Sequence, residues 1–419
     1  MEGSRLPCIV TAMRIVKVLE QGYSDVDFAT WQDLQKSEDF RRLVDRGFLS
    51  VSFGSGRNVR FHGKCYVGRI ICGDIIVELQ EKIQGALRCL LEYASHNVFK
   101  VERISGPSSD LGSLASLLVR QYLTAVKAYV SRGRQFEYAV RSKVGSLAGG
   151  RLDVARTAWL RARGLGHIVA FEKTVITHDT LLNRIVFAAL CEVGRLVQLI
   201  NVDQADLAEA RSLMMLFEDC RHADVAFGSR TNLVRLAHSL LNNRLDAAYK
   251  DLIGLASVII GHISFEHSPE VRAAMPRAWF LNLQSLFEDA VRNVFAGEIV
   301  MPWHILGGVN LSRPVFPAEN GLLHAHPDIL ILQGRNVVAV GDVKYKNWSG
   351  SFLASDMYQL LVHAAAFDCD RSFLVYPADR FDWRYLGRSV TGSEVWLFAV
   401  DVRDLRHGVK MIIHSLGLV

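Results

Sequence analysis

Two aspartates and a lysine within one short segment have the types and spacing of a metal-dependent hydrolytic site. Asp328 opens one apolar run, and Asp342 and Lys344 follow a second one. Carboxylate oxygens suit Mg²⁺ or Mn²⁺, and such an ion polarises a phosphoryl oxygen and lowers the pKa of the water that it binds. A lysine beside the carboxylates can orient that water or offset developing negative charge. The three residues therefore favour metal-dependent phosphodiester hydrolysis.

A β-hairpin would bring these three side chains together. The apolar runs 329–332 and 337–340 flank Gln-Gly-Arg-Asn, which predicts two strands joined by a turn. If the strands pair antiparallel, Asp328 and Asp342 lie at the same open end, and Asp342 and Lys344 leave the same face of their strand. Aspartates at hairpin ends are also common turn chemistry, so a purely structural role stays open for the triplet alone.

Two predicted helices flank the hairpin and add candidate groups. Residues 279–295 have apolar side chains at helical spacing, and Glu288 lies at the edge of that stripe, where it could be a third metal-facing carboxylate. A helix predicted over 356–367 carries Tyr358 and Gln359 one turn in. This order of an acidic helix, a Pro-Asp strand, an Asp-x-Lys strand and a Tyr-Gln helix resembles the PD-(D/E)XK nuclease superfamily, which implies Mg²⁺-dependent cleavage of DNA.

The whole chain resembles a narrower family within that superfamily. Its C-terminal half is similar to the McrC family, the nuclease subunits of McrBC modified-cytosine restriction systems, through Phe287-Glu288, Pro327-Asp328, Asp342-Val343-Lys344-Tyr345-Lys346 and Asp356-Met357-Tyr358-Gln359. Weaker upstream similarities follow in the same order: Tyr66-Val67-Gly68 with Gly73-Asp74-Ile75, Arg132-Gly133, Gly150-Arg151-Leu152-Asp153, and His178-Asp179-Thr180 with Asn183-Arg184. The chain departs from the family at Glu81-Lys82-Ile83, where Pro-Lys-Ile is usual.

The resemblance implies a role for each candidate residue. Glu288, Asp328 and Asp342 would face the metal, and Lys344 would orient water or stabilise charge. Tyr358 and Gln359 would support these groups near the phosphate. The implied substrate is double-stranded DNA with modified bases.

A separate motor is expected, because the chain contains no GxxxxGK[S/T] phosphate-binding loop and should not hydrolyse nucleotide itself. The resemblance implies that an AAA+ GTPase of McrB type supplies translocation and base recognition. This chain would then cleave DNA, stimulate the motor and assemble with the motor ring.

Composition limits the setting of the protein. The chain has 419 residues, half of them apolar, so it can bury sizeable cores, and its formal net charge is +5. Seven cysteines without a C-x-x-C pair give neither a disulfide framework nor a zinc site. We see no secretory signal, and the apolar run 252–263 is about half a membrane span. A cytoplasmic protein without membrane contact is expected.

Patterning along the chain predicts an α+β multidomain protein. Short β-rich pieces occupy a partner-engaging N-terminal region, 1–110, and helical periods dominate 111–275. Pro269 and Pro276 mark the expected boundary to a restriction-endonuclease-like α/β domain over 276–419.

Some observations leave alternatives open. The middle region contains the basic residues Arg132, Arg134, Arg141, Lys143 and Arg151. They could contact DNA phosphates, meet an acidic partner or line a solvated helical face. His324 and His326 form a poor metal signal without a nearby cysteine pair. The protein could also be a free-standing PD-(D/E)XK nuclease in DNA repair or another defence system, or a non-catalytic adaptor that binds DNA or activates a motor.

Overall fold

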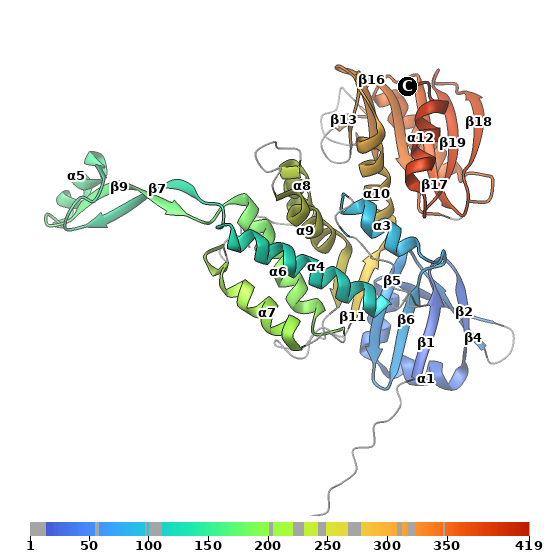
Figure 1. The fold of residues 1–419 in the computed structure, drawn as a ribbon, viewed down its shortest axis with the longest axis horizontal. Coiled ribbons are helices and arrows are strands. Elements are labelled where there is room, and N and C mark those ends of the chain that lie inside the picture. Colours follow the sequence, from blue (N-terminus) through green and yellow to red (C-terminus); the bar gives the residue numbers. More distant parts are fainter. Residues whose placement is uncertain are drawn as a thin grey trace, which may run out of the picture.

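The computed structural model describes most of the chain, which has the mixed α and β multidomain fold that we expected (Figure 1). The chain forms N-terminal sheets, a group of helices interrupted by a projecting arm, and a C-terminal sheet. The expected boundary residues Pro269 and Pro276 lie outside the described part. The described residues are 14–54, 58–96, 99, 111–200, 204–220, 230–241, 249–266, 278–307, 312–316, 323–346 and 348–418.

The N-terminal region contains two sheets around one apolar core that includes Phe40, Phe61 and Phe280. The larger sheet has the order β1 (Arg14–Leu19), β6 (Ile75–Gln80), β5 (Tyr66–Cys72), β11 (Ala278–Asn282), β10 (Ile263–Glu266). The smaller sheet has the order β2 (Tyr23–Asp27), β4 (Asn58–Gly63), β3 (Leu49–Phe53), with helices α1 (Phe28–Lys36) and α2 (Glu38–Asp45).

Strand β11 corrects one expectation about the sequence. We predicted a helix from Trp279, but residues 278–282 form a strand paired with β5, and helix α10 (Leu283–Glu298) starts after Asn282. The Asn282 side chain accepts the N–H groups of Gln284 and Ser285, which sets the helix start. The four residues before Asn282 are buried on both faces of an inner strand of the sheet. They therefore lack the alternation of apolar and polar side chains that marks a half-buried strand. The larger N-terminal sheet therefore takes strands from both sides of residue 276.

Close packing explains one of the motif glycines. A Cβ at Gly68 would lie 2.2 Å from the carbonyl oxygen of Trp279, a distance that real side chains do not reach. Only glycine lets β11 pass this close to β5.

Helices form much of the middle region, and their core continues into the C-terminal sheet. The helices that pack together here are α3 (Ala86–Ala94), α4 (Leu111–Ser131), α6 (Leu181–Leu196), α7 (Gln204–Met215), α8 (Arg230–Leu241) and α9 (Lys250–His262). No described helix combines the length and the apolar character that crossing a membrane requires.

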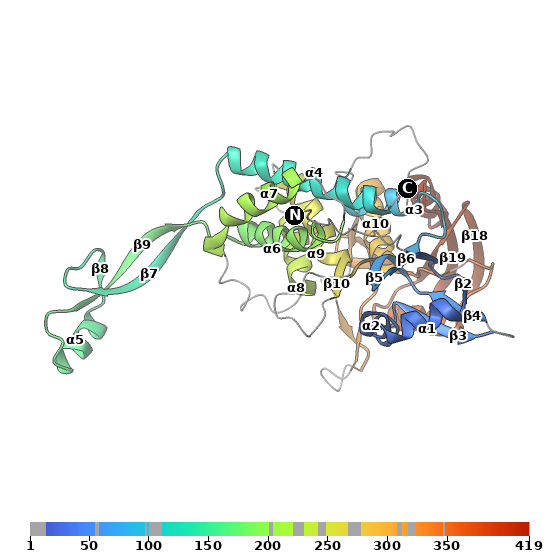
Figure 2. The same cartoon turned by 90° about the horizontal axis from the view of Figure 1, so that it is seen from below.

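A long arm interrupts the helices, and the sequence analysis did not predict it. It projects away from the rest of the molecule in both views (Figures 1 and 2). Strands β7 (Glu137–Gly145) and β9 (Val169–Thr177) pair over their full length, and β8 (Arg151–Leu152) and α5 (Val154–Ala162) form its tip. Most side chains of β7 are exposed on both faces, so the strand lacks the apolar alternation that marks a half-buried strand.

Several upstream motif residues lie at the joints of this arm. Gly133 has a φ of +91° where the chain leaves α4, and Asp153 caps α5 by accepting the N–H of Arg156 at 3.0 Å. Asn183, at the start of α6, donates to the carbonyl oxygens of Gln135 and His178. These contacts fix the arm at its base and shape its tip.

The C-terminal region is a six-stranded sheet with helices on both faces. Alternate side chains of the sheet pack on α10 and α12 (Leu405–Ser415) or on α11 (Ala354–Ala366). The strand order is β12 (Trp303–Leu306), β15 (Ile329–Gln333), β16 (Asn336–Val343), β17 (Arg371–Ala378), β19 (Glu394–Asp401), β18 (Asp382–Arg388). A short ribbon joins β13 (Arg313–Pro314) and β14 (His324–Ala325).

Candidate active site

The predicted hairpin forms and carries Asp328 and Asp342 at its open end. Strands β15 and β16 pair antiparallel about a turn at Gly334 and Arg335, and Gly334 has a φ of +63°, a conformation that glycine adopts without strain. The two aspartates are 14 residues apart in the sequence and meet only because of this turn.

A β-bulge sets which residues face each other at that end. The register shifts by one residue after Ile331, so Ile329 pairs with Gly341. Continuing the pairing by one residue places Asp328 opposite Asp342. Without the bulge, Asp328 would face Gly341 and the two carboxylates would lie on opposite faces of the sheet.

Three carboxyl groups, from the residue before β15, the end of β16 and helix α10, share this end of the sheet. The Asp328 carboxylate accepts the N–H of Val343 at 2.8 Å. Burial, the charge of Asp342 and a hydrogen bond with it raise the pKa of Asp328 to about 7. Burial and the charge of Asp328 likewise raise the pKa of Glu288, on α10, to about 7. Both groups therefore keep their protons to a higher pH than exposed carboxyl groups do.

Lys344 lies beside this cluster. Its Nζ is 2.5 Å from Oδ2 of Asp342 and donates to Oε1 of Gln359 at 3.0 Å. Burial opposes the charge of the lysine, but the ion pair with Asp342 outweighs it and the pKa of Lys344 is raised. The structure thus brings five of the six predicted residues together, and Lys344 carries a positive charge among them.

Tyr358 is the exception among the six. It lies on α11 next to Gln359, but its side chain is 68% exposed and outside the buried face of the helix. Tyr358 could therefore lie near a substrate phosphate only if the substrate covers this exposed surface of α11.

Lys346 has a role that its sequence position did not reveal. Its Nζ donates to both carboxylate oxygens of Asp356, at 2.6 and 2.9 Å, and Asp356 begins the buried face of α11. This ion pair anchors α11, the helix that carries Gln359, to the strand end that carries Lys344. The sequence could have indicated this ion pair: Lys346 follows Lys344 by two residues, so both leave the same face of the strand, and the acidic Asp356 lies at the start of the next helix.

Tyr345 ties the same strand end to the N-terminal sheet. Its hydroxyl donates to Oε1 of Glu20 at 3.0 Å, and its backbone carbonyl accepts from Gln21. Its ring packs on Phe287, next to Glu288, with centroids 5.5 Å apart. Segments more than 300 residues apart therefore meet one residue from Lys344.

The donor set of the cluster fits a hard divalent cation, because carboxylate oxygens crowd together with raised pKa values that a cation would lower. Within the residues that the structure describes, no three acidic, histidine or cysteine side chains are already arranged to hold a metal ion. Lys344 is the cation nearest to Asp342 in this arrangement.

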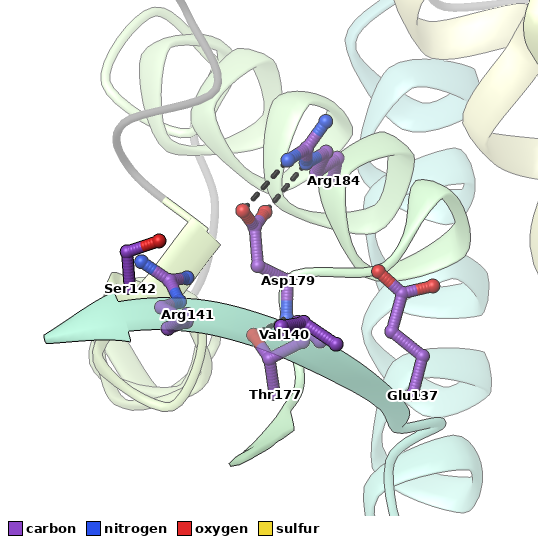
Figure 3. A pocket seen from close by; sticks show the side chains of 8 residues that line it. Glu137, Val140, Arg141, Ser142, Thr177, Asp179 and Arg184 are labelled. Atoms are coloured by element: carbon purple, nitrogen blue, oxygen red, sulfur yellow. Dashed lines mark hydrogen bonds and ion pairs between the residues drawn. The ribbon is translucent and has the colours of Figure 1, made fainter. Parts of the chain in front are cut away.

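A separate pocket of about 470 Å³ lies at the base of the arm. Figure 3 shows Asp179 and Arg184 joined by an ion pair at its wall, with Arg141 and Glu137 beside them. Because Asp179 and Arg184 neutralise each other, the pocket resembles a structural joint more than a catalytic site.

The basic residues of the middle region do not line a helical face. Arg141 and Lys143 lie on β7 and Arg151 on β8, and all three are exposed on the arm. Arg134 instead forms a two-point ion pair with Asp219, at 2.9 and 2.8 Å. The interpretation as a solvated helical face was wrong, because the segment is a β-hairpin.

Two solved structures from Thermococcus gammatolerans are similar to this chain. The first is a refined half-complex from a tetradecameric assembly of McrB AAA+ hexamers with bound McrC; it has 13% sequence identity and a TM-score of 0.44, and the match covers 96% of this chain and 100% of that chain. The second is a cryo-EM structure of the McrBC complex, with 16% identity, a TM-score of 0.36, and coverage of 67% and 86%. No curated protein matches the chain significantly.

The family described as "McrBC 5-methylcytosine restriction system component" matches residues 59–377. This range is well over half of the 419 residues and includes the arm and the acidic hairpin. The chain therefore belongs to the McrBC 5-methylcytosine restriction system component family.

Proposed function

We propose that this chain is the Mg²⁺-dependent DNA endonuclease subunit of a modification-dependent, McrBC-like restriction system. The observation that carries the proposal is the convergence of Asp328, Asp342 and Glu288 with Lys344 at one sheet edge. Clustered buried carboxylates with raised pKa values are costly to a fold and typical of functional sites. Membership of a restriction family favours DNA as the substrate.

Each residue has a distinct part in the proposed chemistry. Asp328, Asp342 and Glu288 would hold the metal ion, which when bound supplies charge stabilisation and an acidic water. Lys344 would place its ammonium beside the phosphate and offset developing negative charge. Gln359 orients Lys344 through its 3.0 Å hydrogen bond. Tyr358 would contact the DNA backbone from the exposed side of α11.

The proposal includes a separate motor protein. Because no GxxxxGK[S/T] loop occurs in the sequence, we infer that an AAA+ GTPase of McrB type moves the DNA and that this chain binds and stimulates it. The arm supports this inference, since its exposed apolar side chains include Tyr138, Leu147 and Trp159. Exposed basic residues between them would suit an acidic surface of a partner.

The test is cleavage of modified double-stranded DNA with the partner, nucleotide and Mg²⁺ present. Asp342→Ala should abolish cleavage, because it removes a proposed metal ligand. Asp25→Ala is the matched control, since Asp25 is an exposed carboxylate on β2 that pairs with Arg60. Equal cleavage by both variants and the parent would overturn the assignment and leave an adaptor role.

A further inference from the structure

Arg292 on α10 lies directly behind the acidic cluster. Its Nε donates to the backbone carbonyl oxygen of Asp328 at 3.2 Å, and its Nη1 donates to Oδ1 of Asp289 at 2.5 Å. The arginine side chain is only 20% exposed. One guanidinium group thus connects the backbone of a candidate metal ligand, Asp328, to the helix that carries another, Glu288.

A histidine of the helical region helps to fix the position of Arg292 through Asp289. Asp289 also accepts from Nε2 of His262, at the end of α9, at 3.1 Å, and Nδ1 of that histidine lies 3.0 Å from Oγ of Ser285. Asp289 thus contacts both His262 and Arg292. These two contacts hold the Asp289 carboxylate in place, and it holds the guanidinium in one orientation.

The neighbouring strand leaves room for this guanidinium. A Cβ at Gly307, which follows β12, would lie 2.5 Å from Cδ of Arg292 and 2.9 Å from the carbonyl oxygen of Asp328. Any side chain at this position would displace the arginine or the backbone that it holds. The absence of a side chain at Gly307 thus leaves the space that the Arg292 side chain occupies.

We propose that Arg292 is a positioning residue that sets the distance between the carboxylates of Asp328 and Glu288, and so the metal affinity of the site. It acts through the Asp328 backbone and touches neither DNA nor metal. Groups that orient metal ligands in this way typically change metal affinity about 10- to 100-fold when they are removed. This inference rests on the proposed function, because it requires that the carboxylates bind a metal ion.

Binding of Mn²⁺ to the purified full-length chain tests the proposal without a cleavage assay. Free Mn²⁺ is measured by electron paramagnetic resonance during a titration at constant pH. Arg292→Lys keeps one positive charge beside Asp289 but replaces the rigid planar group, whose Nε and Nη1 reach the two acceptors, with a single flexible ammonium, so we expect Mn²⁺ affinity to fall about 10-fold. Gly307→Ala should weaken binding in the same direction while retaining the arginine.

The control is Arg406→Lys, on α12. Arg406 pairs with Glu298 at the other end of α10, at 2.8 Å, and its side chain is 55% exposed. This variant changes an arginine that also pairs with α10 but does not contact the Asp328 backbone, so its Mn²⁺ affinity should equal that of the parent. A second readout is rescue: excess Mn²⁺ should restore DNA cleavage by Arg292→Lys in the complete complex.

The outcomes separate this inference from the proposed function. Parental Mn²⁺ affinity in folded Arg292→Lys and Gly307→Ala would overturn the positioning role and leave the nuclease proposal intact. A lower unfolding temperature with unchanged Mn²⁺ affinity would show that Arg292 only stabilises the fold. If Arg292→Lys does not fold, Gly307→Ala decides. Absence of Mn²⁺ binding by the parent would overturn both proposals.

Discussion

At the scale of residues, Asp328 and Glu288 link the candidate site to pH. Their pKa values of about 7 exceed the values of about 4 that these groups have in an unfolded chain. The folded state therefore binds more protons between about pH 4 and pH 7, and the free energy of unfolding falls as the pH rises through this window. Above about pH 7 both carboxyl groups are ionised, and the free energy of unfolding no longer changes with their titration.

The melting temperature of the metal-free protein should therefore fall between pH 5 and pH 8. Asp328→Asn should flatten this dependence, because it removes one of the two groups. At pH 8, Mg²⁺ should raise the melting temperature of the parent by mass action and leave that of the variant nearly unchanged. Thermal unfolding with and without Mg²⁺ measures both effects; a variant with the parental pH dependence would contradict the assigned pKa shift.

The two lysines of the Asp-x-Lys strand should fail in different ways. Lys344→Ala should lower the cleavage rate roughly 10²-fold, because it removes positive charge beside the phosphate, and it should also lower stability, because the buried Asp342 loses its ion-pair partner. Lys346→Ala leaves Asp356 without its partner and should cost about 1–2 kcal/mol, since Lys346 is 43% exposed and the pair is partly screened. Single-turnover cleavage distinguishes the two, and chemical denaturation measures both losses of stability. Equal rate losses in equally stable variants would refute this division of roles.

At the scale of elements, Tyr345 tests how the N-terminal sheet supports the site. Tyr345→Phe removes the hydroxyl that donates to Glu20, a buried group whose pKa is raised chiefly by burial. The loss should cost about 1–3 kcal/mol, because the buried Glu20 carboxyl keeps the longer hydrogen bond from the N–H of Lys82, at 3.4 Å, and loses the shorter one from Tyr345. Denaturation measures this cost, and Tyr66→Phe, which removes a hydroxyl at the edge of the N-terminal core, is the control. A stability equal to that of the parent would mean that the link is dispensable.

The hairpin and its neighbours show which elements the sequence could predict. Apolar runs on both sides of a Gly-containing turn identified β15 and β16, and helical periods identified α6, α10 and α11. The arm gave no such signal, because most side chains of β7 are exposed on both faces of the strand. Strand β11 was hidden because it is buried on both faces and directly precedes a helix. Arg292 was not predicted, since its acceptor is a backbone carbonyl 36 residues away.

At the scale of the whole molecule, the N-terminal sheet and the C-terminal hairpin cannot be separated by cutting the chain. Strand β11 pairs with β5, and Tyr345 contacts Glu20, so removal of residues 1–110 would expose the core around Phe280. The division into units 1–110, 111–275 and 276–419 remains a prediction, and the larger N-terminal sheet crosses its boundaries through β10 and β11. The arm is the part whose removal should leave the rest folded.

Replacing residues 143–171 with an Asn-Gly turn should shorten the arm and keep its base, where Glu137 pairs with Thr177. We expect the shortened chain to keep its melting temperature and lose its stimulation of the AAA+ partner, because the exposed apolar tip is gone. Nucleotide hydrolysis by the partner, with and without the chain, measures this. Full stimulation by the shortened chain would place the partner contact elsewhere.

The central claim is that this chain cuts DNA with the Asp328–Asp342 hairpin end while another protein hydrolyses nucleotide. One reaction tests it directly: modified DNA, the AAA+ partner, GTP and Mg²⁺ are mixed with the parent or with Asp328→Ala, and cleavage and nucleotide hydrolysis are followed together. The account predicts cleavage by the parent only and equal hydrolysis in both reactions. Cleavage by Asp328→Ala at the parental rate, or hydrolysis of GTP by the chain without its partner, would contradict it.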